Sequence, residues 1–258
     1  MIFLLSPAKS LDYETPVVSG LPAYKPLYTR PAGQLISLLK TKTPAQISTL
    51  MDLSDKLAAL NVARYQAWKP TATAKNAKQA ILAFDGDVYD GLNAKNLSLE
   101  QLTWADEYFC ILSGLYGALR PLDLLQPYRL EMGTALPNVN GKNLYEFWGD
   151  TVSAHINKLQ KADKEPVVIN LASQEYFKVV NKKILKARVI ECVFEEYKNG
   201  AYKVISFLAK RARGMMARFA IERQINEPEK LKAFKTDGYA FAKAASTEDR
   251  WVFRRRQT

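Results

Sequence analysis

Apolar residues along the chain occur in two patterns. Short continuous runs predict strands, and spacings of three and four predict helices. Short continuous apolar runs at residues 2–5 (IFLL) and in VVINLAS (167–173) are typical of buried strands, and the first should deliver Lys9 into a loop. From Pro44 to about Trp68 apolar residues lie three and four apart, which predicts helix. The fold class is therefore mixed, α/β or α+β.

Turn residues divide the rest of the chain. The segment ILAFDGDVYDG (81–91) predicts a strand and a turn, and QEYFKVVNKK predicts a helix capped by Ser173. After Val189, two β-rich runs flank Asn199-Gly200, a dipeptide favoured in tight hairpins. No repeat or linker divides residues 1–258, so we expect a single domain, or two intimately packed lobes.

Composition narrows the chemistry. Apolar residues make up 48% and charged residues 24% of 258 residues, as in ordinary globular proteins. No apolar run approaches the roughly 18 residues of a membrane span, and no basic region precedes the first apolar stretch, so we expect a cytoplasmic chain without a membrane partner.

Cysteine and histidine are scarce. Cys110 and Cys192 sit in apolar runs and are expected to be buried free thiols, without the polar neighbours that a peroxidatic cysteine needs. The single histidine, His155, lies in a helical pattern expected to tolerate solvent. A catalytic triad, a zinc site or a haem ligand would lack its usual residues, so we expect no metal or cofactor, and we find no credible iron site.

The net charge of +11 is unevenly distributed. Residues 1–129 hold 13 Lys and Arg against 11 Asp and Glu, whereas residues 130–258 hold 24 against 15. An excess confined to one half favours a polyanionic partner, with nucleic acid first and an anionic membrane second.

One predicted helix, at residues 209–223, carries much of this charge. At about 100° per residue, its four leading cations share an arc of about 160°, and an apolar arc lies opposite. Gly214 and Ala217 also project from the basic arc, so phosphates could approach the backbone closely. A basic face is often merely solvated. The four cations are Lys210, Arg211, Arg213 and Arg218, and the expected core face is Ala212, Met215, Met216, Phe219 and Ala220.

A second basic cluster precedes the predicted hairpin. It contains no acidic residue, so a bound anion would relieve its internal repulsion. If the hairpin brings the two clusters to one side, they form a basic groove. The cluster consists of Lys178, Lys182, Lys183, Lys186 and Arg188.

Two stretches are candidates for a helix-hairpin-helix element, which presents backbone N–H groups to a DNA phosphate. The first, 57–64, leads to Arg64 but has Ala59 where glycine is usual. The second, 112–121, has glycines and leads to Arg120. Each stretch is a weak signal, and the alternative is an ordinary helix-turn-helix packing corner or a strand-to-loop turn.

Catalytic groups give a rival hypothesis. Lys9 ends the first predicted strand, where α/β folds gather active groups. Asp85, Asp87 and Asp90 lie close enough in sequence to hold Mg²⁺, although such stretches are more often turns. An enzyme acting on nucleic acid or a phosphorylated small molecule would need Lys9, Asp85, Asp87 and basic residues in one pocket.

Several long segments carry a family resemblance: SPAKSLDY, ISTLMDLSDKLAALNVARY, LSGLYGALRPLDLLQPYRLEMG, VVINLASQEYFK and ISFLAKRARGMMARF. Through them, from Met1 to about Phe253, the chain resembles the YaaA family of bacterial peroxide-stress proteins. The resemblance implies an unusual α/β fold in one continuous unit, with a basic cleft and a helix-hairpin-helix element. It also implies DNA binding, and protection through lower intracellular iron or association with DNA repair. It brings no established catalytic activity.

Carried onto this chain, the hairpin element fits Leu57 to Arg64 better than the stretch around Gly114, because helical periodicity flanks it on both sides. We therefore expect a DNA-binding protein of the peroxide-stress response that contacts phosphates with little sequence specificity and depends strongly on salt. DNA, duplex or branched, is the expected partner, and no small-molecule substrate is identified.

Overall fold

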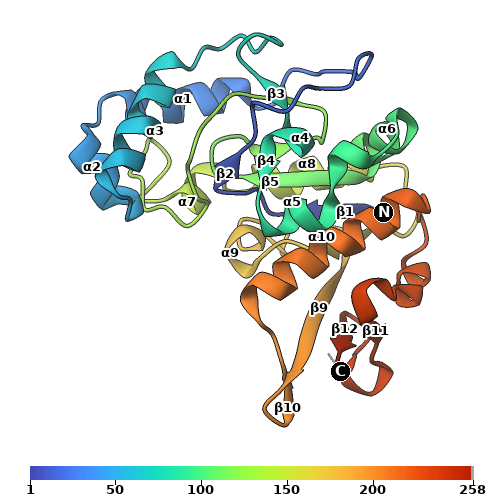
Figure 1. Ribbon diagram of the computed structural model, residues 1–258. Coiled ribbons are helices and arrows are strands. Elements are labelled where there is room, and N and C mark those ends of the chain that lie inside the picture. Colours follow the sequence, from blue (N-terminus) through green and yellow to red (C-terminus); the bar gives the residue numbers. More distant parts are fainter. Residues whose placement is uncertain (257–258) are drawn as a thin grey trace.

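The computed structural model describes residues 1–256 and confirms a mixed α/β fold (Figure 1). One large sheet has the strand order β11-β12-β9-β8-β1-β5-β6, and β10 pairs with β9. Neighbours from β12 through β9, β8 and β1 to β5 are parallel, whereas β6, β10 and β11 are antiparallel to their partners. These strands are β1 (Ile2–Leu5), β5 (Phe109–Ser113), β6 (Gly117–Leu119), β8 (Val167–Asn170), β9 (Arg188–Lys198), β10 (Ala201–Lys203), β11 (Ala240–Phe241) and β12 (Arg250–Arg255).

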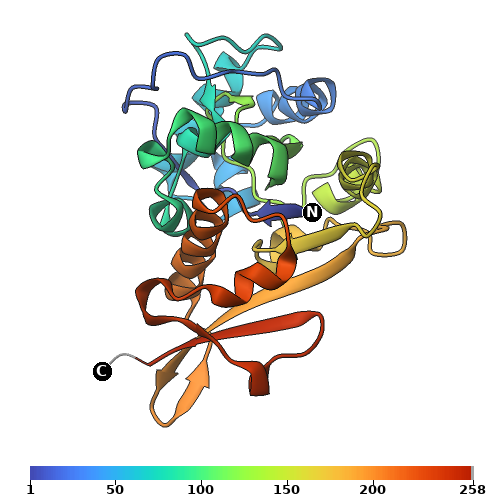
Figure 2. The ribbon, with the colours of Figure 1, turned by 90° about the vertical axis from the view of Figure 1, so that its right-hand side faces the viewer.

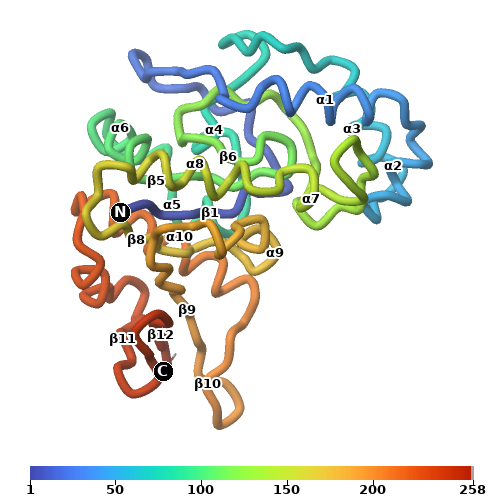
Figure 3. Tube along the Cα trace, turned by 180° about the vertical axis from the view of Figure 1, so that it is seen from behind, coloured from blue at the N-terminus to red at the C-terminus, as the bar shows by residue number. Residues whose placement is uncertain are grey.

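Helices cover both faces of this sheet. α5, α6 and α10 lie in front of it in Figure 1, and α8 lies nearest the viewer from behind (Figure 3). No helix within residues 1–256 is long and apolar enough to cross a membrane. The helices are α1 (Thr29–Lys40), α2 (Pro44–Met51), α3 (Asp55–Ala67), α4 (Ala80–Ala83), α5 (Asp87–Leu92), α6 (Leu99–Tyr108), α7 (Leu144–Trp148), α8 (Thr151–Leu159), α9 (Gln174–Phe177) and α10 (Ser206–Glu222), with the 3-10 helices η1 (Ala94–Asn96), η2 (Pro228–Ala233), η3 (Thr236–Gly238) and η4 (Lys243–Ala245).

The central position of β1 in the sheet explains why its sequence is continuously apolar. All four residues of β1 are buried, with β5 on one side and β8 on the other. Phe3 stacks on Phe109 of β5 with ring centroids 4.6 Å apart. A parallel strand covered on both faces must be apolar at every position, so the prediction from IFLL is confirmed.

The predicted hairpin is confirmed at its turn. Asn199 and Gly200 have φ values of 54° and 82°, the left-handed pair that a tight two-residue turn requires. β9 and β10 carry this turn well away from the rest of the molecule (Figures 1 and 2). The second run is a strand only to Lys203, because α10 begins at Ser206.

Other local predictions had mixed outcomes. The helical pattern from Pro44 is confirmed as α2 and α3, and Ser173 accepts a capping bond from the Tyr176 N–H, although α9 is only four residues long. The strand predicted in ILAFDGDVYDG is wrong except at β4 (Phe84–Asp85), because helices α4 and α5 flank it. A short apolar run cannot by itself distinguish strand from helix.

The two thiols and the histidine are all interior. Cys110 and Cys192 are buried and unpaired, as predicted, and burial raises the pKa of each thiol to about 12. The helix predicted around His155 is confirmed as α8, but the expectation of solvent exposure is wrong for His155, which is 9% exposed and packs edge-on against the Tyr28 ring. Two small antiparallel pairs, β2 (Ser10–Leu11) with β4 and β3 (Lys78–Gln79) with β7 (Leu124–Leu125), complete the described structure.

Candidate functional site

A cleft of about 260 Å³ lies where β1 and β8 end. The loop after β1 forms one wall, and the start of α5, the short helix α9 and the first half of α10 form the others. Ser6 and Ser173 join the two strand ends, because the Ser173 N–H donates to Ser6 Oγ (2.8 Å). The carboxyl ends of neighbouring parallel strands are the usual place for a ligand in α/β folds.

Lys9 enters the cleft from the loop after β1. Its Nζ lies 3.5 Å from Glu131 Oε1, and its side chain is 68% exposed. Arg129 Nε also donates to this Glu131 oxygen (3.1 Å). The other carboxylate oxygen, Glu131 Oε2, is buried without a hydrogen-bond partner among the described residues. Glu131 is therefore held firmly by one oxygen and keeps the second as an unused acceptor.

Two cations reach the cleft from α10. Lys210 Nζ lies 3.9 Å from Asp87 Oδ2, and its side chain is 51% exposed. The Arg213 side chain is only partly exposed and makes no hydrogen bond or ion pair within residues 1–256. Burial lowers the pKa of Arg213, and the negative charge of Glu191 opposes that shift. Arg213 is thus a desolvated cation without a protein partner in hydrogen-bonding range.

The cleft is not uniformly positive. Lys9, Lys210 and Arg213 face the carboxylates of four acidic residues, two of which already pair with these lysines. No group of three or more His, Cys, Asp or Glu in the described part of the chain is arranged to hold a metal ion. The cleft can therefore offer both positive charge and hydrogen-bond acceptors to one ligand. The four acidic residues are Asp85, Asp87, Glu131 and Glu175.

The face of α10 that was expected to lie open is closed by α5. Gly214 and Ala217 are both buried, which corrects the expectation that phosphates could approach the backbone there. A β-carbon on Gly214 would overlap the carbonyl oxygen of Val88, and one on Gly91 would overlap that of Arg211. The small residues on the basic arc therefore serve the close crossing of two helices.

The predicted core face of α10 is confirmed, since all five of its residues are buried. The cations on the other arc lie in different settings. Arg218 donates to the carbonyl oxygens of Leu92 (3.1 Å) and Asn93 (2.8 Å) at the end of α5, and pairs with Glu222. Arg211 is exposed and makes no ion pair within residues 1–256. Of the four predicted cations of α10, Lys210 and Arg213 line the cleft.

The second basic cluster lies apart from the cleft. Lys178 and Lys182 line two other hollows beside α9, and Lys183 lines one of these; none of them lines the cleft that contains Arg213. Lys178 also lies over the Tyr145 ring, 4.8 Å from its centroid. The hairpin thus does not place both clusters on this cleft. Lys186, the remaining lysine, is exposed, and its backbone N–H donates to Asn157 Oδ1.

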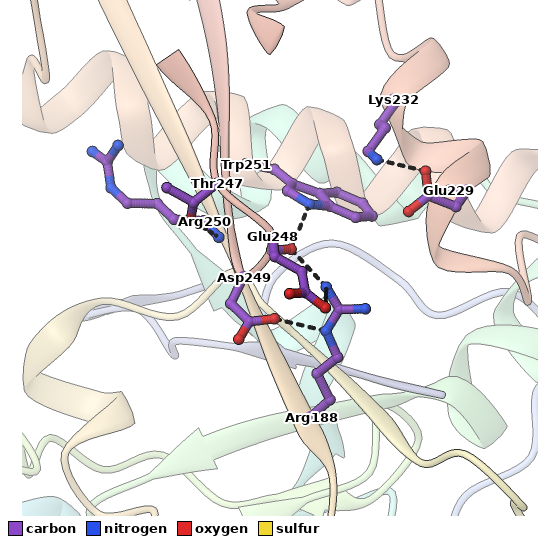
Figure 4. A network of polar contacts seen from close by, with 8 residues as sticks. All are labelled: Arg188, Glu229, Lys232, Thr247, Glu248, Asp249, Arg250 and Trp251. Carbon is purple, nitrogen blue, oxygen red and sulfur yellow. Dashed lines mark hydrogen bonds and ion pairs between the residues drawn. The ribbon is translucent and has the colours of Figure 1, made fainter. Parts of the chain in front are cut away.

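Arg188 is compensated by charges that are distant in sequence (Figure 4). Its Nε donates to Asp249 Oδ1 (2.6 Å), and its Nη2 donates to the backbone carbonyl of Glu248 (2.7 Å). The Trp251 indole N–H donates to the same carbonyl. This network ties the start of β9 to the segment that leads into β12, which local sequence could not reveal.

Both placements of the hairpin element are wrong. Residues 57–64 lie entirely inside α3, and the stretch 112–121 contains the turn between strands β5 and β6. The corner between helices α2 and α3 instead falls at Asp52, whose φ of 50° is left-handed. Residue 59 is ordinary helix and needs no glycine.

The other predicted cations have structural neighbours. Arg64 lies on α3 near Arg129, and burial lowers the pKa of Arg64. Arg120 pairs with Asp106 and Asp123 and lies over the Tyr24 ring. Sequence reasoning missed Arg129 and Glu131, although both fall in the quoted segment LSGLYGALRPLDLLQPYRLEMG.

Comparisons with known proteins cover the whole chain. A family model described as "Peroxide stress protein YaaA" matches residues 1–245. The chain is 62% identical to a UPF0246 protein of Polaromonas sp., covering 100% of this chain and 99% of that protein. It is 61% identical to one of Leptothrix cholodnii (99% and 98% covered) and 59% identical to one of Ralstonia pickettii (100% and 100%). The names of these relatives state no activity.

Proposed function

Because the chain belongs to the family of the peroxide stress protein YaaA, we propose that it is a cytoplasmic DNA-binding protein of the peroxide-stress response. It grips the phosphate backbone with little sequence specificity, and so protects DNA or assists its repair. The observation that carries this proposal is Arg213, a partly buried guanidinium without a partner among residues 1–256, in a cleft that also holds Lys9 and Lys210. Phosphates, like carboxylates, match the geometry of the guanidinium and accept paired hydrogen bonds from it.

Further cations lie near the cleft. Arg129 contacts the same Glu131 oxygen as Lys9, and Arg64 lies close enough to Arg129 to feel its charge. These side chains form a path from α10 across the cleft to α3. With the net charge of +11, they support contact with several consecutive phosphates.

The corner of α2 and α3 is our candidate for the helix-hairpin-helix element. Asp52 supplies the left-handed residue of the tight turn. Ser54 makes no side-chain capping bond, so its side chain leaves the first N–H groups of α3 open to an outside acceptor. Arg64 lies on the same helix, in its last turn, at the end away from this corner.

A salt series of DNA affinities tests this function. Duplex, branched and single-stranded probes should all bind, with a logarithm of affinity that falls steeply and linearly with the logarithm of salt concentration. The slope should be similar for unrelated duplex sequences. Weak binding at low salt, or binding that is insensitive to salt, would contradict the proposal.

A second candidate is an enzyme that acts on nucleic acid or a phosphorylated small molecule. It is favoured by the meeting of Lys9, Asp85 and Asp87 with Lys210 and Arg213 on one cleft. The same DNA probes, incubated with Mg²⁺ and examined for cleavage, test it. Cut probes, with cutting abolished in Lys9→Met and Asp87→Asn, would favour the enzyme.

We propose that any lowering of intracellular iron is indirect. The scarcity of His and Cys makes a direct iron site chemically unfavourable, since imidazole and thiolate are common iron ligands. Tight, stoichiometric iron binding by the purified chain would contradict this proposal.

A further inference from the structure

We propose that the cleft between Lys9, Glu131 and Arg213 receives one nucleotide unit, either a nucleotide extruded from DNA or a free nucleoside monophosphate. Its phosphate would lie against Arg213 and Lys210, and an N–H or O–H group of its base or sugar would donate to Glu131. The extruded form rests on the proposed DNA binding, whereas the free form does not.

Arg213 identifies the anionic end of the ligand. A guanidinium removed from water without a partner costs free energy, so native structures normally pair it. The Arg213 side chain has no hydrogen-bond or ion-pair partner within residues 1–256, although the charge of Glu191 acts on it, and it lines the cleft. Lys210, one turn earlier on α10, lines the same wall. A phosphate in the cleft would give Arg213 a partner and would share Lys210 with Asp87.

Glu131 identifies the opposite end. Its buried Oε2 lacks a donor, while Arg129 and Lys9 hold Oε1 in place. A ligand that is only an anion would leave this oxygen unsatisfied and would be repelled by the carboxylates around it. The ligand must therefore carry a hydrogen-bond donor as well as a phosphate, as a nucleotide does.

The size and lining of the cleft fit one nucleotide. Its volume of about 260 Å³ lies just below the usual range for small-molecule sites, roughly 300–1,000 Å³. Pro7, Ala8, Val88 and Tyr176 supply an apolar wall for a sugar or base ring. A base paired within a duplex cannot enter a site of this size, so a DNA nucleotide must first leave the stack.

The experiment uses the full chain with two probes. The first is a duplex with 2-aminopurine opposite a mismatched base, whose fluorescence rises when it unstacks. The second is free dAMP, followed by calorimetric titration. Saturating wild-type protein should raise the fluorescence of the duplex, or bind dAMP, or both. Arg213→Gln should weaken nucleotide capture by roughly tenfold or more, the order expected for a lost charge-assisted hydrogen bond.

Matched variants separate capture from general DNA affinity. Arg211→Gln removes the same charge from the same helix outside the cleft, and should leave the fluorescence rise at saturation unchanged. Glu131→Gln should reduce the fluorescence rise or the affinity for dAMP. It should not lower the affinity for DNA, because the substitution removes a negative charge. Circular dichroism checks each fold, and Arg213→Lys, which keeps the charge, serves if the glutamine variant misfolds.

The outcomes are distinguishable. DNA binding without a fluorescence rise, together with no dAMP binding, overturns the nucleotide site but leaves DNA binding intact. Binding of dAMP without DNA binding supports the site as one for a free nucleotide and overturns the proposed function. Equal effects of Arg211→Gln and Arg213→Gln on capture would also overturn the site.

Discussion

Gly91 of α5 and Gly214 of α10 lie opposite each other where the two helices cross. A β-carbon on either residue would overlap a backbone carbonyl oxygen of the other helix. The crossing closes the middle of the basic arc and leaves Lys210 and Arg213 at the cleft. These glycines therefore position two of the candidate ligand-binding side chains.

Enlarging Gly214 should destabilise the fold. Gly214→Ala must push α5 away from α10, and we expect the free energy of unfolding to fall by about 3 kcal/mol. Chemical denaturation measures this. Gly33→Ala on α1 is the control, because its β-carbon would make ordinary contacts with Trp68. It should be neutral or stabilise by about 0.5–1 kcal/mol. Equal effects of the two substitutions on the free energy of unfolding would contradict the close contact of α5 with α10 at Gly214.

Arg218 should act mainly on stability. Because it donates to two carbonyl oxygens at the end of α5, we expect Arg218→Gln to cost about 1–2 kcal/mol of unfolding free energy. Arg211→Gln, at an exposed and unpaired position, should change it by less than about 0.5 kcal/mol. A stable Arg218→Gln protein with much weakened DNA binding would show instead that Arg218 contacts phosphate.

In contrast to Arg218, Arg213 should matter more for DNA binding than for the stability of the fold. Its desolvated charge has no hydrogen-bond or ion-pair partner in the described part of the chain, so Arg213→Gln is expected to leave the melting temperature unchanged or slightly higher. The same protein should bind DNA more weakly. A large drop in melting temperature would mean that the side chain has a structural role.

His155 should make stability depend on pH below neutrality. Burial, with help from the charges of Lys158 and Arg120, lowers its pKa from 6.5 to about 4. The unfolded chain therefore binds the proton more tightly, and stability is lost as pH falls from about 6.5 to 4. Between pH 7 and pH 5 this group alone should cost about 2 kcal/mol.

His155→Leu isolates that contribution. Denaturation curves of wild type and variant, measured at several pH values, should differ by an amount that grows as pH falls from 7 to 5. Taking the difference removes the contributions of other groups that titrate over the same range. Asp123 is one of them, because burial raises its pKa to about 7. A difference that is constant with pH would show that His155 titrates normally.

The charge reversal of the cleft cations should flatten the salt dependence of DNA binding. Replacing Lys9, Lys210 and Arg213 together by glutamate should weaken binding to all duplexes and lower the salt slope by roughly 2–3, since each lost phosphate contact removes about 0.9. Affinities across a salt series provide the measurement. The same substitutions at Lys230, Lys232 and Lys235, outside the cleft, serve as the control.

Local patterns in the sequence determined much of the framework. The runs IFLL and VVIN specified buried strands, Asn199-Gly200 specified the hairpin, and the apolar arc of α10 specified its buried face. Each depends on residues only a few positions apart, whose spacing and backbone preferences act within one element. The motifs of the chain also indicated the family that the comparisons show.

Only the tertiary structure decided how the charges are used. Arg213 and Arg218 share one arc of one helix, yet the first faces a cleft and the second holds the end of α5. Arg188 belongs to an uncompensated cluster in sequence but meets Asp249 in space. Glu131 reaches Lys9 across more than a hundred residues. The partner of a charge depends on contacts between elements distant in sequence, and helical periodicity within one element carries no information about those contacts.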